Sequence, residues 1–109
     1  RSKAFTLANG SYPEWPKQLE NKADVWEQIN LSGNLICQIP PLDAFTNLSV
    51  LNLDSNNLTE VPKSIFSLQS LTSLSLCSND ITDVSKLADA TRLKTLHLSG
   101  NNLRTCPDF

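Results

Sequence analysis

The side chains best suited to catalysis are few and form no recognisable constellation. His97 is the single histidine of the chain, and it stands between Leu96 and Leu98 in an alternating apolar segment. The candidate nucleophiles nearest to it in the repeat pattern described below are Ser75 and Cys77. A Cys–His dyad needs a thiolate and a third group that orients the imidazole, and no residue at an arguable spacing supplies that group. His97 is therefore interpreted as a solvated surface residue, no catalytic residue is assigned, and the chain is not expected to be an enzyme.

Metal, phosphate and nucleic-acid chemistry have equally little support. The three cysteines, Cys37, Cys77 and Cys106, have neither the spacing of a zinc site nor that of a disulfide framework. Asp80 and Asp83 lie near an expected turn but do not form a calcium loop. With three glycines the sequence has no phosphate-binding motif, and its net charge of −2 lacks the basic character of a nucleic-acid-binding protein. We therefore expect no cofactor and no metal, and there is no direct indication of nucleic-acid binding.

Four asparagines at nearly equal spacing reveal an internal repeat: Asn34, Asn56, Asn79 and Asn101. Apolar residues precede and follow each of them at fixed offsets, in the pattern L-x-x-L-x-L-x-x-N-x-L. The four sets are Trp26, Ile29, Leu31 and Ile36; Leu48, Leu51, Leu53 and Leu58; Leu71, Leu74, Leu76 and Ile81; Leu93, Leu96, Leu98 and Leu103. Alternating apolar residues face one side of a short strand. An Asn side chain can satisfy turn backbone groups that would otherwise be buried without partners, so we interpret this asparagine column as structural.

This pattern resembles the leucine-rich-repeat family. Repeats of 22–23 residues with Ile-Pro or Val-Pro after the turn resemble its intracellular branch. We therefore expect an α/β solenoid, a right-handed superhelix of four parallel strands near 28–30, 50–52, 73–75 and 95–97. Loops and short helical pieces should form its convex side. The expected repeats are 26–47, 48–70, 71–92 and an incomplete 93–109.

The two ends of a solenoid must be covered, and here they differ. Residues 1–25 are expected to form an N-terminal tail and a helical cap, since Pro16 suits a first helical position and Leu19 and Ala23 share a face near Trp15. The sequence stops halfway through the fourth repeat. We expect the native protein to continue and the uncovered last coil to allow self-association; the alternative is that Phe109 folds back as a minimal lid.

A finer resemblance concerns the start of the chain. Trp15-Pro16, followed by Ile29-Asn30-Leu31-Ser32-Gly33, is similar to the opening of cytosolic leucine-rich-repeat proteins that carry a tRNA-synthetase-like B3/B4 domain.

Three free thiols and the lack of a cysteine-rich cap favour a cytoplasmic location. Four N-x-[ST] patterns keep a secreted origin open, at Asn9, Asn30, Asn47 and Asn57. No apolar run is long enough to span a bilayer, so no membrane association is expected.

The side chains between the strand leucines are free of the core and should form the concave, outer side of the sheet, which we call the sheet face. It has three columns: Gln28, Val50, Ser73, Thr95; Asn30, Asn52, Ser75, His97; and Ser32, Asp54, Cys77, Ser99. The candidate partner-binding residues are Gln28, Asn30, Asn52, Asp54, Ser73, Ser75, Thr95 and His97.

The sheet face is polar and nearly uncharged, and it has no aromatic residue of the kind that dominates binding hot spots. We expect a protein-interaction module of unknown partner, part of a larger protein. The alternatives are a regulatory or targeting domain of a larger enzyme or RNA-associated protein, and a secreted or receptor ectodomain.

Overall fold

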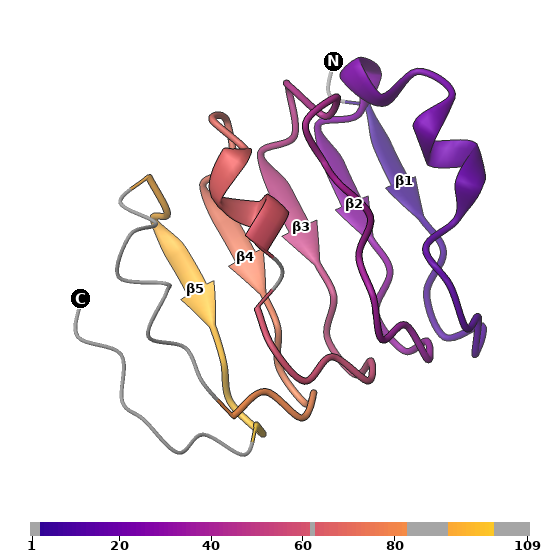
Figure 1. The fold of residues 1–109 in the computed structure, drawn as a ribbon, viewed down its shortest axis with the longest axis vertical. Helices are drawn as coiled ribbons and strands as arrows, with labels where there is room; N and C mark the ends of the chain where they lie inside the picture. Colours follow the sequence, from indigo (N-terminus) through magenta and orange to yellow (C-terminus); the bar gives the residue numbers. More distant parts are fainter. Residues whose placement is uncertain (1–2, 62, 83–91, 102–109) are drawn as a thin grey trace.

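Five short parallel strands form one sheet in the computed structural model, which describes residues 3–61, 63–82 and 92–101 (Figure 1). They pair in sequence order. The strands are β1 (Ala4–Thr6), β2 (Gln28–Asn30), β3 (Val50–Asn52), β4 (Ser73–Ser75) and β5 (Thr95–His97). The four predicted strands are therefore confirmed at their predicted positions, and the prediction of four strands in total was wrong by one.

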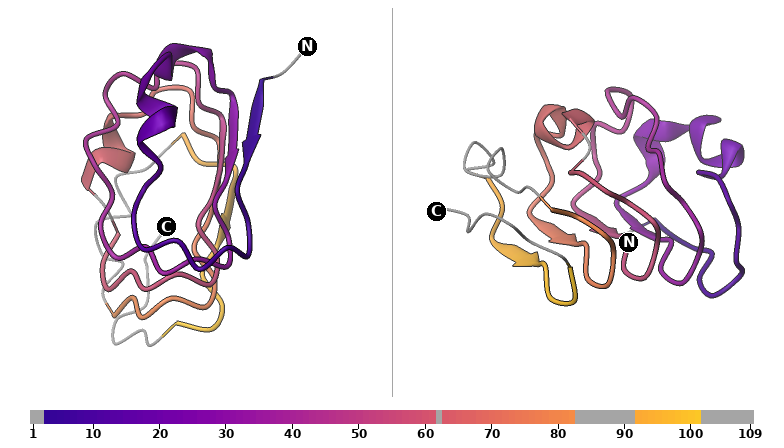
Figure 2. Two further views of the ribbon diagram at one scale, coloured as in Figure 1. Left: turned by 90° about the vertical axis from the view of Figure 1, so that its right-hand side faces the viewer. Right: turned by 60° about the horizontal axis from the view of Figure 1, so that its bottom comes forward.

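The register of the sheet stacks the apolar residues of successive repeats. Ile29, Leu51, Leu74 and Leu96 are direct partners across β2 to β5. The first three are buried, and Leu96, on the last described strand, is partly exposed. Figure 2 shows the chain as flattened coils, with the sheet along one side and the return segments along the other. The core lies between these two layers.

The return segments contain short 3-10 helices rather than α-helices. These are η1 (Lys17–Glu20), η2 (Ala23–Val25) and η3 (Lys63–Ser67). Ile65 and Leu68 are buried here, as their spacing on one helical face predicts. The first return segment begins with Pro40-Pro41 and has no helix, because prolines disfavour regular helix. Residues 83–91 of the third return segment lie outside the described residues, as do Cys106, Phe109 and the C-terminal end that was expected to allow self-association.

The expected helical cap consists of two 3-10 turns instead of one helix. Lys22 separates η1 from η2 with φ of 149°, which no helical residue adopts. The side chains chosen for the cap are nevertheless buried: Trp15, Leu19 and Ala23. The Trp15 ring packs edge-on against Phe45, with ring centroids 5.8 Å apart. The cap therefore covers the return side of the first repeat.

Residues 4–12 were expected to be a tail. They form the strand and the following turn of an additional coil. Phe5 pairs with Ile29, and the Asn34 side chain donates to the Leu7 carbonyl at 2.8 Å and accepts from the Tyr12 amide at 3.0 Å. The sequence pattern hides this coil because Gly10 stands where the other repeats have asparagine.

Each turn after a strand passes through a left-handed residue just before the asparagine column. These residues have φ between 57° and 76°: Asn9, Gly33, Ser55, Ser78 and Gly100. Glycine adopts this conformation without steric cost, whereas a residue with a Cβ is strained by it. The repeat geometry demands this conformation even where serine occupies the position.

Replacing Gly33 by alanine should lower the free energy of unfolding by about 1–2 kcal/mol from the left-handed backbone alone. A Cβ at this position would also lie 3.0 Å from the Asn9 Cα, which adds to the cost. Ser55→Gly, at the equivalent turn of the next repeat, is the matched control and should not destabilise the fold. Urea unfolding measures both, and a Gly33→Ala protein as stable as the wild type would contradict the turn geometry.

Candidate functional site

The sheet face brings the predicted partner-binding residues together. Strand pairing aligns Gln28, Val50, Ser73 and Thr95 in one column and Asn30, Asn52, Ser75 and His97 in the next. Gln28, Thr95 and His97 are exposed, and the others are partly exposed. β1 extends these columns with Ala4 and Thr6, two positions that the sequence analysis missed because the first coil lacks the asparagine.

The asparagines of the second column shape the bend that follows each strand. Asn30 Oδ1 accepts a hydrogen bond from the Ser32 amide at 3.0 Å, and Asn52 Oδ1 accepts one from the Asp54 amide at 2.9 Å. Such a bond between a side chain and the backbone two residues on stabilises a turn. The amide oxygens are thus engaged by the chain, and the NH₂ groups remain as donors on the sheet face.

In the third repeat a different hydrogen bond stabilises the bend after the strand. Ser75 stands in place of the asparagine, and the Cys77 amide donates instead to Asp54 of the preceding repeat, at 2.7 Å from Oδ1. The Ser75 hydroxyl donates to the same oxygen at 2.6 Å. Two donors on one oxygen hold the Asp54 carboxylate in a defined orientation.

The candidate nucleophiles, Ser75 and Cys77, have hydrogen-bond partners other than His97. The hydroxyl proton of Ser75 points to a carboxylate rather than to His97, and the thiol of Cys77 accepts from the Ser99 hydroxyl at 3.3 Å. Neither contact links a nucleophile to His97, so the described contacts contain no Ser–His or Cys–His pair. Within the part of the chain that the structure describes, no three His, Cys, Asp or Glu side chains are grouped to hold a metal ion.

The asparagine column is bonded to the backbone of two coils at once. Asn56 Oδ1 accepts from the Ile36 amide at 3.0 Å, and its Nδ2 donates to the carbonyls of Leu31 and Leu53 at 3.0 and 3.1 Å. Asn79 and Asn101 repeat this arrangement one and two coils further on. The amide groups of the column are therefore engaged by the fold itself, which leaves them little capacity for a ligand.

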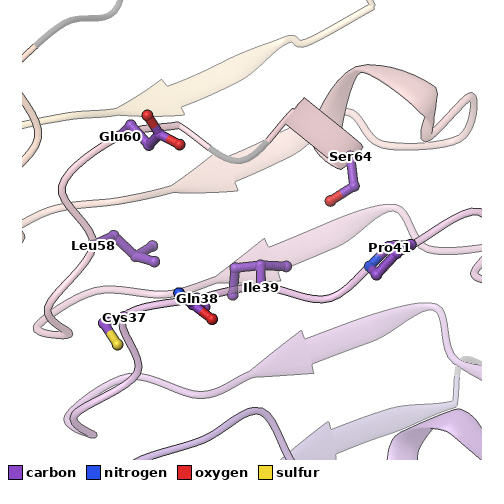
Figure 3. A pocket seen from close by; sticks show the side chains of 7 residues that line it. All are labelled: Cys37, Gln38, Ile39, Pro41, Leu58, Glu60 and Ser64. Carbon is purple, nitrogen blue, oxygen red and sulfur yellow. The ribbon is translucent and has the colours of Figure 1, made fainter.

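A hollow of about 590 Å³ lies on the return side, away from the sheet face (Figure 3). Ile39, Pro41 and Leu58 contribute its apolar lining, and Glu60 supplies a charge at one end. The exposed thiol of Cys37 borders both this hollow and a neighbouring one of about 440 Å³. No sequence pattern marks these hollows, because segments from different repeats form their walls.

The repeat geometry agrees with a comparison of the sequence with protein-family models. The leucine rich repeat model matches residues 46–103, more than half of the chain. The chain belongs to the leucine-rich-repeat family. In the described residues, this repeat protein has no helix long and apolar enough to cross a membrane.

Two relatives that match this chain are much longer proteins. A probable inactive serine/threonine-protein kinase of Dictyostelium discoideum is 39% identical over 82 residues, which are 75% of this chain and 4% of that protein. Leucine-rich repeat-containing protein 58 of Xenopus tropicalis is 33% identical over 92 residues, which are 82% of this chain and 26% of that protein. The chain therefore spans about a quarter or less of these relatives.

A solved structure shows the same solenoid. Internalin C2 of Listeria monocytogenes superposes with a TM-score of 0.81 at 27% sequence identity, over 94% of this chain and 44% of that one. This confirms the predicted α/β solenoid.

Proposed function

We propose that this leucine-rich-repeat domain is a protein-interaction module that binds its partner through the sheet face and performs no chemistry itself. One observation carries the proposal: strand pairing holds rows of partly exposed polar side chains that the core does not need. Solenoids use such extended surfaces for binding. Amide, hydroxyl and imidazole groups in fixed rows suit hydrogen bonding to a polypeptide.

A second candidate is a regulatory or targeting domain within a larger protein. It is favoured by the length of the relatives, of which the matched segments form only 4% and 26%. The two proposals are compatible, because a targeting domain also works by binding. We further propose a cytoplasmic location, since Cys37 and Cys77 are free thiols. A mass decrease of the cellular protein on treatment with an N-glycosidase would contradict this location.

The triple variant Gln28→Ala, Thr95→Ala, His97→Ala should weaken partner binding by about tenfold or more, a loss of about 1.4 kcal/mol shared by three exposed contact side chains. All three side chains are exposed on the sheet face. Proteins captured from cells by the wild type and lost with the variant are the candidates, and titration calorimetry on the purified candidate gives the affinity.

The matched control is the pair Asn57→Ala, Gln69→Ala, which are exposed positions outside the sheet face. Partner binding should survive in this variant. If the control weakens binding as much as the triple variant does, the partner does not use the sheet face.

A further inference from the structure

Asp54 is the single carboxylate in the three columns of the sheet face, near their centre. Its two hydrogen bonds both end on Oδ1, from the Ser75 hydroxyl at 2.6 Å and the Cys77 amide at 2.7 Å. Its partners are therefore a hydroxyl and an amide rather than a basic side chain. The second oxygen, Oδ2, keeps its lone pairs, and the side chain is partly exposed.

Two further acceptors flank this carboxylate. The Ser75 hydroxyl gives its proton to Asp54, so its oxygen can accept; the Cys77 sulfur lies 3.9 Å from the same oxygen. Asn52 Oδ1 accepts one bond from the Asp54 amide and can accept another. Asn52 and Ser75 are direct partners on β3 and β4, so they lie beside each other in the sheet. The Asp54 carboxylate and the neutral acceptors of Ser75 and Asn52 therefore lie close together on the sheet face.

We propose that this place, formed by Asp54, Ser75 and Asn52, seats the ammonium group of a lysine side chain of the protein partner. The inference rests on the proposed function, because the lysine belongs to a partner bound on the sheet face. An ammonium has three donors and no acceptor, which matches three acceptor atoms. Arginine fits less well, because its two-pronged bond to a carboxylate needs both oxygens and Oδ1 already has two donors.

The test uses short peptides and the full 109-residue chain labelled with ¹⁵N. The peptide acetyl-Gly-Lys-Gly-amide should shift the backbone amide signals of Asp54 and Cys77. Its acetyl-lysine form, which lacks the charge, should bind about fivefold more weakly, because an exposed ion pair contributes up to that factor. The arginine form should also bind more weakly than lysine. Equal binding of the lysine and acetyl-lysine peptides would overturn the proposal without any protein variant.

A pair of charge variants locates the seat. Asp54→Asn keeps an oxygen that can accept from Ser75 and Cys77 but removes the charge, so lysine-peptide binding should fall about fivefold. Asp80→Asn removes the same charge from an exposed residue outside the sheet face and should leave binding unchanged. An equal loss in both variants, or no loss in Asp54→Asn, would show that lysine binds elsewhere on this acidic chain.

The peptide experiment and the partner experiment test the lysine seat and the proposed function independently. Loss of partner binding in the triple variant, which leaves Asp54 intact, tests the sheet face as a binding surface. If that loss occurs while the peptides bind without charge preference, the lysine seat is wrong and the proposed function stands. If the seat binds lysine but neither the triple variant nor Asp54→Asn weakens partner binding, the sheet face as the partner surface is wrong.

Discussion

Replacing Leu53 by alanine is expected to lower the free energy of unfolding by about 2–5 kcal/mol, as loss of a buried leucine side chain does when a cavity remains. Leu53 is 0% exposed and follows the central strand β3. The equivalent leucines on either side, Leu31 and Leu76, are also 0% exposed. Coils on both sides prevent collapse into the space, so the cost should lie in the upper half of this range. Urea unfolding followed by circular dichroism gives the value.

Leu35→Ala is the matched control. It removes the same atoms as Leu53→Ala, but from a side chain that is 48% exposed to water. Its effect should stay within about 0.5 kcal/mol, as for other surface positions. A similar loss in the two variants would mean that the repeat register places the wrong leucine in the core.

Replacing Asn56 by alanine should also destabilise the fold, because a buried hydrogen-bonding group loses its partner. Asn56 is 5% exposed, and its loss removes the acceptor of the buried Ile36 amide and the donor to the Leu31 and Leu53 carbonyls. The Leu31 and Leu53 carbonyls keep hydrogen bonds from Asn34 and Asn79, so the Ile36 amide is the group left unpaired, at a cost of about 1–3 kcal/mol. The same unfolding experiment should therefore show a loss of about 1–3 kcal/mol.

Asn57, the next residue, tests whether the effect belongs to the column or to any asparagine in the turn. Its side chain is exposed, and the turn uses its backbone amide, which donates to the Ile36 carbonyl. Alanine keeps that amide, so Asn57→Ala should be close to neutral. If Asn57→Ala proved as damaging as Asn56→Ala, the assignment of the asparagine column would be wrong.

The strands could be predicted because their cause is local. Alternation of apolar and polar residues puts two side chains on one face within three residues. Repetition at nearly constant spacing then aligns the strands, as the register of Leu51 with Leu74 confirms. β1 was missed because its coil has Gly10 at the asparagine position. The Asn34 side chain hydrogen-bonds to the backbone of that coil, at the Leu7 carbonyl and the Tyr12 amide. Backbone groups leave no mark in the sequence, because every residue type except proline has both.

The sequence by itself determined the repeat, the strands β2 to β5, the buried leucines and the residues that share the sheet face. Only the tertiary structure decided that Ser75 and Cys77 donate across to Asp54, that an additional coil contains β1, and that segments of different repeats border an open hollow beside Cys37. The physical reason is the range of the contacts. Periodicity places a side chain inside or outside its own coil, whereas its hydrogen-bond partner is chosen by the coil stacked next to it, more than twenty residues away.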